Sequence, residues 1–361
     1  MYTITDCEGI PKTDIRMKNK DSKYIPILAI TMGDPSGIGP EIAAKAFSEK
    51  SIYKQSRPIL IGHVPTMAKA ITIARTKLKI NTIKDPSEAK YQPGIMDVFE
   101  IGGADSDQIL FGEISALAGD FAFRSVKAAI DLALEKKVDG TVTGPIHKEA
   151  INKAGYHFSG HTEIYANLTN SKKYAMLLIY NDLKIIHVST HVSLRHACDL
   201  VNMERIIDVT LLLDNFLKKT GILIPRIGIA GLNPHASDGG LFGNEENDEI
   251  IPAIEKLRDQ GIVIDGPVPA DALFSMALGG KFDGCVAMYH DQGHIPLKLL
   301  GFKWNKKKNK MESVSGVNIT LGLPILRTSV DHGTAFEIAG KGIASPDALM
   351  NAIEYAVKLL N

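Results

Sequence analysis

The sequence predicts an α/β fold in which two interleaved α/β domains enclose a central cleft. Short apolar runs that end in glycine, proline or histidine recur along the chain and are typical of buried strands, at 27–32, 141–144, 227–230, 286–289 and 319–321. Helical patterns lie between them, such as the broad apolar face of 117–137 and the stretch 245–260. This alternation is characteristic of proteins whose helices cover a mostly parallel sheet.

The length of the chain favours two domains. Its 361 residues, of which 45% are hydrophobic, suffice for two packed cores. Because the sequence has no internal repeat and no low-complexity linker, we expect interleaved domains rather than domains joined in series. We place a polar tail at 1–24, a first domain at 25–140 plus 306–361, and a central domain at 141–305.

The composition excludes several classes of protein. Lys plus Arg and Asp plus Glu each number 41, so the net charge is zero and no long-range field attracts nucleic acid or an anionic membrane. No apolar run is long enough to span a bilayer, and residues 1–24 lack the apolar core of a signal peptide. Cys7, Cys198 and Cys285 form neither a disulfide pattern nor a metal cage. We therefore expect a cytoplasmic protein that catches any anionic ligand through local contacts.

Residues 33–41, with the sequence Gly-Asp-Pro-Ser-Gly-Ile-Gly-Pro-Glu, follow the first predicted strand and lead into a helix. Pro40 suits the first helical turn, and the loop brings free backbone N–H groups to the edge of the cleft. The alternative is a tight turn without a ligand. Because the spacing is not G-x-G-x-x-G, the segment does not indicate a Rossmann dinucleotide site.

Three other segments have clear local patterns. Residues 176–180 and 184–189 flank Asn181-Asp182 and predict an antiparallel hairpin, and 304–310 is a lysine-rich loop or hairpin tip. Residues 346–360 predict a terminal helix. The glycine-rich stretch 331–346 before that helix is irregular, which suits a loop that wraps a nucleotide.

Three histidines, His191, His235 and His290, come directly after apolar runs. Imidazoles that converge from separate strand ends can hold zinc or another divalent ion with one position open for substrate, and an acidic neighbour such as Asp291 can orient a ligand. The alternative is that each is a hydrogen-bonded structural residue. We interpret the remaining strand-end and loop histidines, namely His63, His157, His187 and His196, as structural or surface residues.

Two further clusters suit an anionic substrate. His161 and Thr162 lie in a loop of small residues and can donate hydrogen bonds. Lys298, Asn318 and Arg327 lie near predicted strand termini, and arginine binds phosphate or carboxylate in a bidentate way. A solvated face is the alternative for Lys298 and Arg327. Both lie in apolar segments, however, where an unpaired charge is costly and a bound anion removes that cost.

Taken together, these segments resemble the PdxA family, the 4-hydroxythreonine-4-phosphate dehydrogenases of vitamin B6 synthesis, from about Ile27 to the C-terminus. The motifs that carry the resemblance occur in family order: GDPSGIGPE, TGPIHKEAIN, SGHTE, THVSLR, GLNPHASDGG, GPVPADALF, YHDQGHIPLK and SGVNITLGLPILRTSVDHGTAFEIAGKG. The first and last are also similar to stretches of isopropylmalate and isocitrate dehydrogenases. The resemblance therefore implies the fold of those enzymes and a non-Rossmann way of binding NAD.

The resemblance also implies specific ligands and residues. It implies NAD or NADP, one divalent metal (zinc, magnesium or cobalt), and a homodimer whose active site takes residues from both subunits. The metal ligands would be His191, His235 and His290. The phosphorylated substrate would contact His161, Thr162, Lys298, Asn318 and Arg327. The cofactor would contact Gly333, Thr334, Gly340 and Gly342. Asp291, Lys148 and His147 are candidates for moving protons, and the sequence does not rank them.

The chain departs from the vitamin B6 enzymes by an insert at about 302–313. It resembles a branch with such an insert that acts on four-carbon 4-phosphosugar acids. We therefore expect oxidation of the C3 hydroxyl of D-threonate or D-erythronate 4-phosphate, followed by decarboxylation to a phosphorylated ketone. The alternatives are 4-hydroxy-L-threonine 4-phosphate as substrate, a phosphate acyltransferase, or a protein that only binds a phosphorylated metabolite.

Overall fold

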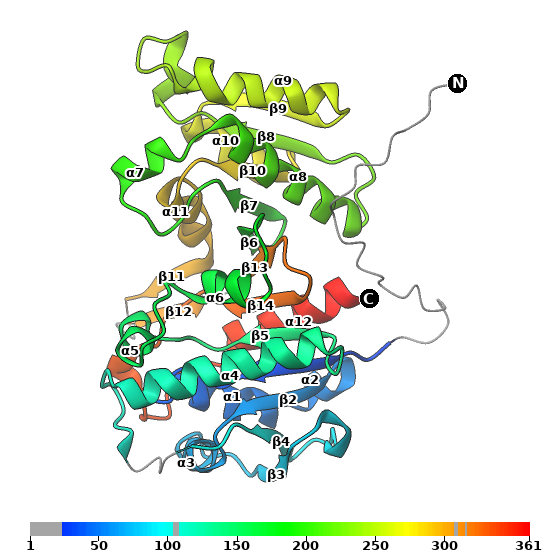
Figure 1. The fold of residues 1–361 in the computed structure, drawn as a ribbon, viewed down its shortest axis with the longest axis vertical. Coiled ribbons are helices and arrows are strands. Elements are labelled where there is room, and N and C mark those ends of the chain that lie inside the picture. The colour runs from blue at the N-terminus through cyan, green and yellow to red at the C-terminus, as the bar shows by residue number, and fades with distance from the viewer. Residues whose placement is uncertain (1–23, 104–107, 307–309, 315) are drawn as a thin grey trace.

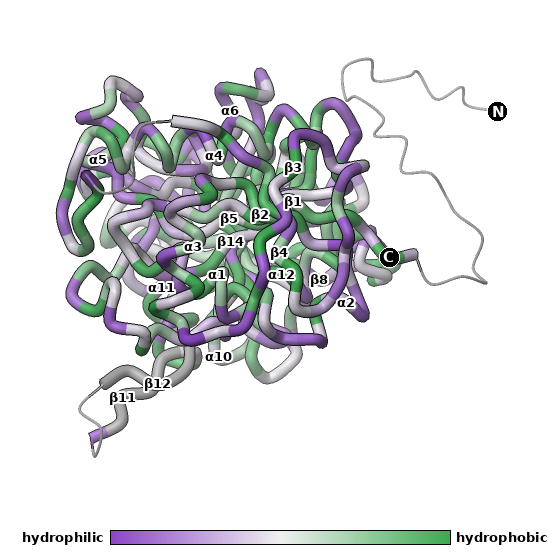
Figure 2. Tube along the Cα trace, turned by 90° about the horizontal axis from the view of Figure 1, so that it is seen from below, coloured by the Kyte–Doolittle hydropathy of each residue, from purple (hydrophilic) through white to green (hydrophobic). Residues whose placement is uncertain are grey.

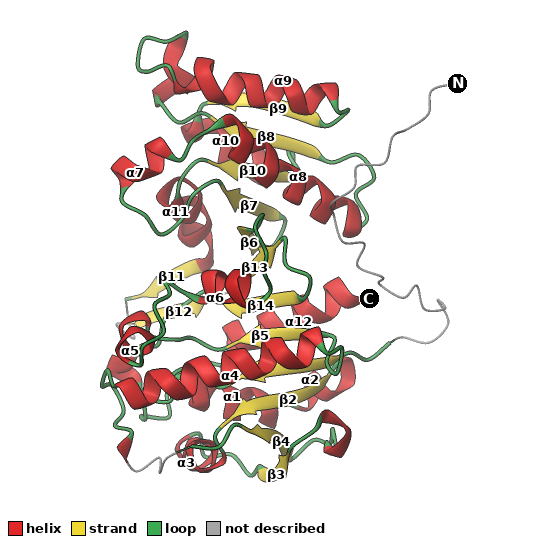
Figure 3. Cartoon of the chain, in the orientation of Figure 1, coloured by secondary structure: helices red, strands yellow, loops and turns green. Residues whose placement is uncertain are grey.

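The computed structural model describes residues 24–103, 108–306, 310–314 and 316–361. Its centre is a single twelve-stranded sheet, with helices on both faces (Figure 1 and Figure 3). The predicted α/β class is confirmed. Residues 1–23 of the predicted polar tail lie outside the described residues, and the hydroxyl of Tyr24 donates to the carboxylate of Asp139 at 2.8 Å.

One half of the sheet is entirely parallel. Its strands stand in the order β3-β4-β2-β1-β5-β14, with bounds Lys79–Ile83, Ile95–Glu100, Arg57–Gly62, Ile27–Thr31, Gly140–Thr143 and Leu326–Val330. Five helices cover it, α1 (Gly39–Ser48), α2 (Lys50–Gln55), α3 (Val64–Ile73), α4 (Ala116–Leu134) and α12 (Asp347–Leu360). α4 lies on one face and α12 on the other (Figure 1).

The other half contains a second parallel group in the order β7-β10-β8-β9, with bounds Leu183–His187, Gly284–Ala287, Arg226–Ala230 and Val263–Val268. Antiparallel β6 (Ala175–Tyr180) and β13 (Val317–Leu321) join the two groups. The surrounding helices are α7 (Leu194–Asp199), α8 (Met203–Lys219), α9 (Ile251–Asp259), α10 (Ala270–Leu278) and α11 (His290–Gly301). Two short helices, α5 (Lys148–Lys153) and α6 (His161–Leu168), precede β6, and β11 (Phe302–Asn305) pairs with β12 (Lys310–Val314).

Short single-turn helices complete the fold. These are 3-10 turns at Pro86–Glu88, Pro234–Asp238 and Phe336–Ile338, and a π-helical turn at Glu246–Ile250. Among the described residues, no helix is both long and apolar enough to cross a membrane.

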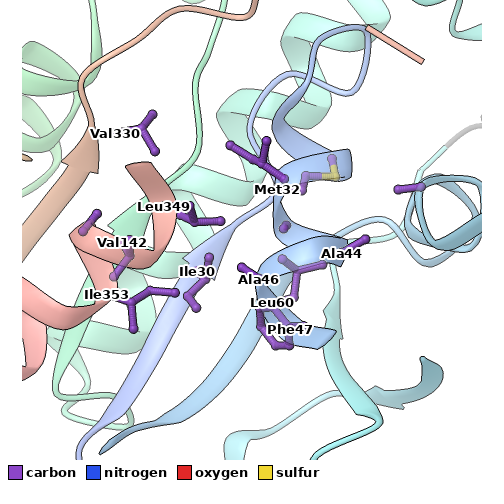
Figure 4. Close-up of a cluster of buried hydrophobic side chains, with 14 of the residues drawn as sticks. Ile30, Met32, Ala44, Ala46, Phe47, Leu60, Val142, Val330, Leu349 and Ile353 are labelled. Atoms are coloured by element: carbon purple, nitrogen blue, oxygen red, sulfur yellow. The ribbon is translucent and has the colours of Figure 1, made fainter. Parts of the chain in front are cut away.

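Apolar strands lie between amphipathic helices, which explains the two periodicities in the sequence. Ile30 of β1, Leu60 of β2 and Val142 of β5 are fully buried and face Phe47 of α1 and Ile353 of α12 (Figure 4). Hydrophobic residues gather along the central strands, and hydrophilic residues along the outer turns (Figure 2). Because parallel strands covered on both faces need apolar side chains at every position, they read as continuous apolar runs.

The predicted elements match the structure closely. All five strand segments, both long helical segments, the 176–189 hairpin and the terminal helix are present, with shifts of a few residues at their ends. Lys298, expected near a strand terminus, instead lies in α11, which continues through Pro296. The tip of the lysine-rich hairpin, 307–309, lies outside the described residues. The sheet runs unbroken through the proposed domain boundaries, so the division into two domains stays a prediction.

Candidate functional site

The glycine loop 33–38 joins β1 to α1 and contacts two other loops. The N–H of Asp34 donates to the carbonyl of Pro145 at 2.8 Å, and the N–H of Ile38 donates to the carbonyl of Thr334 at 3.0 Å. Gly33 has a φ of +73°, and a Cβ there would lie 2.5 Å from the Pro145 oxygen, so only glycine fits. The loop thus fixes the relative positions of the 145–148 and 334–344 segments.

The glycine-rich stretch after β14 is held on α1. Glu41 accepts hydrogen bonds from the N–H groups of Gly342 and Ala344 at 3.1 and 2.8 Å. Lys45 donates to the carbonyl oxygens of the same two residues at 3.0 and 2.6 Å. This arrangement places the predicted cofactor residues, Gly333, Thr334, Gly340 and Gly342, in one loop beside the 33–38 turn. Their contact with a nucleotide stays a prediction.

Arg327 is the most unusual charged group in the fold. It lies on β14, is only 2% exposed, and donates to the hydroxyls of Thr320 at 2.7 Å and Thr143 at 3.1 Å. The ring of Tyr165 lies 5.4 Å from its guanidinium carbon. Burial lowers the pKa of Arg327 to about 10, so it keeps its charge at neutral pH. Among the described residues no carboxylate forms an ion pair with it, and its Nε has no partner.

Helix α6 places its first residues beside this arginine. Thr162 is 7% exposed, and the Nε2 of His161 and the Oε2 of Glu163 are buried without a hydrogen-bond partner. Burial, and then the charge on Arg327, lower the pKa of His161 well below its ordinary value, so its imidazole is neutral. A neutral imidazole, a hydroxyl and a guanidinium in one place form a set of donors that suits a phosphate or carboxylate.

The two remaining substrate candidates lie on neighbouring elements. Asn318, on β13, has a buried Oδ1 without a partner. Lys298, on α11, is half-buried, and its positive charge acts on the carboxyl of Asp331 and on His332. Burial raises the pKa of Asp331, and its Oδ2 is a further buried atom without a partner. The unpaired atoms therefore surround the ends of β13 and β14.

The three predicted metal ligands follow three adjacent strands. His191, His290 and His235 come after β7, β10 and β8, which are neighbours and parallel. The rings of His191 and His290 lie 5.6 Å apart, and His294 stacks on His290 at 3.6 Å. His235 lies in the loop after β8 and packs edge-on against Phe242 at 6.3 Å. The structure thus brings His191 and His290 together, while no contact links His235 to either of them.

The backbone around His235 is strained. His235, Ala236, Ser237 and Asp238 all have φ between +45° and +73°, a left-handed conformation that is costly for residues with a Cβ. The buried carboxylate of Glu246 anchors the start of this segment, because its Oε1 accepts the N–H groups of Leu232 and Asn233, both at 2.7 Å. Glu246 therefore fixes the loop that carries His235.

The donor set fits a divalent metal in its chemistry. The Nδ1 atoms of His235 and His290 face the carboxylates of Asp238 at 3.1 Å and Asp291 at 2.6 Å, which leaves each Nε2 available as a ligand. Burial, and then the charge on Lys148, lower the pKa of His191, which keeps it neutral, as metal binding requires. Among the described residues, however, no group of three His, Cys, Asp or Glu side chains lies close enough to hold a metal. The three-histidine site stays a prediction.

Two of the three candidates for proton transfer, Lys148 and Asp291, differ in position. Lys148 begins α5, lies beside Gly160 at the start of α6, and is close enough to His191 to lower its pKa. The side chain of Asp291 is 70% exposed and is bonded to His290.

A cavity of about 290 Å³ next to His191 is lined by Thr162, Glu163, Tyr174, His187 and Arg205. Lys148 therefore lies near this cavity, and Asp291 faces outwards. The predicted structural residue His187 is buried, with its Nδ1 3.3 Å from the carbonyl of Met176.

Sequence reasoning missed four acidic residues in this region: Asp34, Glu163, Glu246 and Asp331. Asp34, Glu246 and Asp331 are buried and Glu163 is partly buried, and Asp34, Glu163 and Asp331 each have a buried oxygen without a partner. For these last three, the available signal was a carboxylate beside small or apolar residues, which is the same argument that selected Arg327. It did not select the acidic residues because most such carboxylates bond backbone N–H groups, as Glu246 does.

Comparisons with known proteins identify the family of the chain. A family model described as "Pyridoxal phosphate biosynthetic protein PdxA" matches residues 54–356. The D-threonate 4-phosphate dehydrogenase of Cupriavidus necator is 44% identical over 342 residues, which cover 94% of this chain and 98% of that protein. The enzyme of the same name from Salmonella typhimurium is 45% identical over 336 residues, covering 92% of this chain and 98% of the other. The crystal structure of a 4-hydroxythreonine-4-phosphate dehydrogenase from Klebsiella pneumoniae superposes with a TM-score of 0.81 at 42% identity, covering 93% of this chain and all of that one.

Proposed function

This chain belongs to the PdxA family, and we propose that it is an NAD(P)-dependent dehydrogenase that oxidises the C3 hydroxyl of D-threonate or D-erythronate 4-phosphate. The β-keto acid that results would then lose CO2 and leave a phosphorylated ketone. The observation that carries the proposal is the buried guanidinium of Arg327, which has no carboxylate partner among the described residues. A dianionic phosphate would neutralise that charge.

The substrate's phosphate would lie among the side chains of β13, β14 and α6. Arg327 would bind it, His161 and Thr162 would donate to it, and Lys298 and Asn318 would bind the substrate near the ends of β13 and β14. These groups are fixed by packing, so the phosphate would hold the carbon chain in one position for both chemical steps.

The choice of four-carbon acid rests on relatives. The enzymes from C. necator and S. typhimurium are named for D-threonate 4-phosphate, whereas the K. pneumoniae structure is named for 4-hydroxythreonine-4-phosphate. The two substrates differ at C2, which bears a hydroxyl in one and an ammonium in the other. We favour the hydroxy acid and keep 4-hydroxy-L-threonine 4-phosphate as the alternative.

His191, His235 and His290 would hold one divalent metal, either zinc, magnesium or cobalt, which when bound supplies Lewis-acid stabilisation of negative charge on substrate oxygen. The side chains themselves have other tasks. Asp238 and Asp291 would keep the Nε2 atoms of His235 and His290 directed at the ligand position. Lys148, beside His191, would accept the hydroxyl proton in its neutral amine form as hydride leaves C3 for the nicotinamide.

The nucleotide would lie along the loop that contains Gly333, Thr334, Gly340 and Gly342. Glu41 and Lys45 hold that loop on α1, and its glycines would allow close approach of a pyrophosphate. We further propose a cytoplasmic homodimer in which each active site takes residues from both subunits. A partner subunit would account for the distance of His235 from His191 and His290, since the described residues of one chain contain no group of three possible metal-binding side chains.

Two other classes of function are less well supported. A phosphate acyltransferase needs no cluster of strand-end histidines, and a pure metabolite-binding protein needs no nucleotide loop. Metal dependence separates the proposal from the first, and NAD binding separates it from the second.

The decisive test is NAD reduction by the purified, metal-loaded protein with D-threonate 4-phosphate and, in parallel, with D-threonate. We expect NADH and CO2 in equal amounts with the phosphorylated acid only. Equal rates with both acids would show that the enzyme does not recognise the phosphate. Formation of NADH without CO2 would support the oxidation and contradict the decarboxylation.

A further inference from the structure

Three buried polar atoms near the start of α1 have no hydrogen-bond partner. They are the Oδ2 of Asp34, the Oγ of Ser36 and the Nδ1 of His147. Asp34 and Ser36 are completely buried. The other oxygen of Asp34 accepts the N–H of Ser36 at 2.8 Å, so one oxygen fixes the turn while the other is unused. Because a buried unpaired polar atom costs free energy, its retention points to a ligand.

These atoms lie where three loops meet. The backbone N–H of His147 acts on the carboxylate of Asp34, and the 33–38 turn bonds both Pro145 and Thr334. The ring of Phe336 stacks on the ring of His147 at 4.9 Å with a 16° angle between planes. Thr334 and Phe336 belong to the loop assigned above to the nucleotide. The unpaired atoms and a flat aromatic surface therefore lie together beside that loop.

Their position along the site indicates which part of a dinucleotide they face. His147 directly precedes Lys148, whose charge reaches His191. The cluster is thus at the reacting end of the proposed site, where the nicotinamide must lie if hydride is to pass from C3. The nicotinamide ring carries a primary carboxamide, which has one N–H₂ donor group and one carbonyl acceptor.

We propose that Asp34, Ser36 and His147 bind the carboxamide of the nicotinamide and so orient the ring for hydride transfer. The inference rests on the proposed function and extends it to Asp34 and Ser36, which have no role above, and to His147, named above only as a candidate for moving protons. Asp34 Oδ2 accepts from the amide nitrogen, and Ser36 or His147 donates to the amide carbonyl. Burial raises the pKa of Asp34 to about 6, so at pH 7 the carboxyl is mostly an acceptor, as this pairing requires.

The test compares dinucleotides that differ only at this group. Calorimetry would give dissociation constants for NAD, for 3-acetylpyridine adenine dinucleotide, which lacks the amide nitrogen, and for nicotinic acid adenine dinucleotide, which carries a carboxylate. We expect the wild-type protein to bind NAD at least ~10-fold more tightly than either analogue, the fold-change of one lost charge-assisted hydrogen bond. In Asp34→Asn, where an amide replaces the carboxylate, binding of the nicotinic acid analogue should improve by ~10-fold or more.

Damage to the fold cannot explain tighter binding of the nicotinic acid analogue by Asp34→Asn. The matched control is Asp97→Asn on β4, a fully buried carboxylate that already accepts from Asn81 at 2.7 Å and Tyr91 N–H at 2.8 Å. It should leave all three affinities in the wild-type ratio. If Asp34→Asn also keeps that ratio while the wild type binds NAD, this inference is wrong and the proposed function stands. If the wild type does not bind NAD at all, both are wrong.

Discussion

The pocket around Arg327 and the corner around His191, His235 and His290 differ in how far the single chain completes them. Arg327 is held on three sides by Thr320, Thr143 and Tyr165. The side chain of His235 is 65% exposed and lies on a strained loop. The fold itself therefore fixes Arg327, whereas it leaves His235 apart from His191 and His290.

The difference follows from the elements that carry the residues. Arg327 and Thr320 lie opposite each other on paired strands in the middle of the sheet, where the register fixes both. His191 and His235 lie on the connections after β7 and β8, and His290 is the first residue of α11 after β10. Connections adapt more easily than paired strands. We therefore expect substitutions in the two regions to affect different ligands.

The largest effect should come from Arg327→Lys. Lysine lacks the planar fork and loses at least two charge-assisted hydrogen bonds to phosphate, so kcat/KM for the 4-phosphorylated acid should fall about 1000-fold. The rate with the unphosphorylated acid, already low, should hardly change. Steady-state kinetics with both acids measures the difference.

Tyr165→Phe is the control for this arginine. It keeps the ring under the guanidinium and removes only the hydroxyl that donates to Thr141 at 2.9 Å. A loss of about 5-fold or less is expected, which corresponds to one neutral hydrogen bond. An equal loss for both acids in Arg327→Lys would contradict the phosphate pocket.

A second effect tests whether the buried part of the site is already formed without ligand. Burial raises the pKa of Asp34 from 3.8 to about 6. Between about pH 4 and pH 6, its carboxyl is therefore protonated in the folded state and ionised in the unfolded state. Stability from this group is present at about pH 4 and is lost as the pH rises to about 6. Urea unfolding should show the wild type losing ~3 kcal/mol relative to Asp34→Asn between about pH 3 and pH 7. A difference independent of pH would mean that Asp34 is solvated.

The third prediction concerns the histidine corner. His235→Ala should weaken binding of Co²⁺ or Zn²⁺ by about 100-fold or more, because one of three ligands is lost. Binding of the phosphorylated substrate to the metal-free protein should be unchanged, since Arg327 is untouched. Titration of Co²⁺ absorption gives the metal affinity. Unchanged affinity would exclude His235 as a ligand.

The smallest effect should come from Glu246→Gln, which alters how the His235 loop is anchored. One oxygen still accepts the two backbone N–H groups, but the amide group now faces the donor nitrogen of Asn233, which bonds Glu246 Oε2 at 2.8 Å. Metal affinity should fall by about 10-fold. Asp97→Asn, in which a buried carboxylate far along the sheet is changed, should affect stability and not metal affinity. If Glu246→Gln lowers the stability of the fold as much as it lowers metal affinity, Glu246 has only a structural role.

The helices, the strands and the segments proposed to bind ligands were predictable because they depend on local patterns. Apolar runs ending in glycine or histidine located β1, β5, β8 and β10, and the cost of burying an unpaired charge selected Arg327. Resemblance to a known family supplied the proposed ligands of those residues, and the family assignment was confirmed.

Other features depend on pairings between distant parts of the chain. The insertion of β13 between β14 and β6, and of β10 between β7 and β8, joins segments far apart in the sequence. The left-handed turn at His235 requires the buried Glu246, and no local signal marks four successive positive φ values in residues with a Cβ. The unpaired oxygen of Asp34 is likewise visible only once three loops are brought together.

The central claim is tested most directly by one set of initial rates. The metal-loaded protein, with His235→Ala as control, is given NAD and, separately, D-threonate 4-phosphate, D-erythronate 4-phosphate and 4-hydroxy-L-threonine 4-phosphate, and NADH is measured. We expect turnover of a phosphorylated sugar acid by the wild type, little turnover of the amino acid, and almost none by the variant. Turnover of the amino acid alone would place the enzyme in vitamin B6 synthesis, and turnover that does not need the metal would contradict the account.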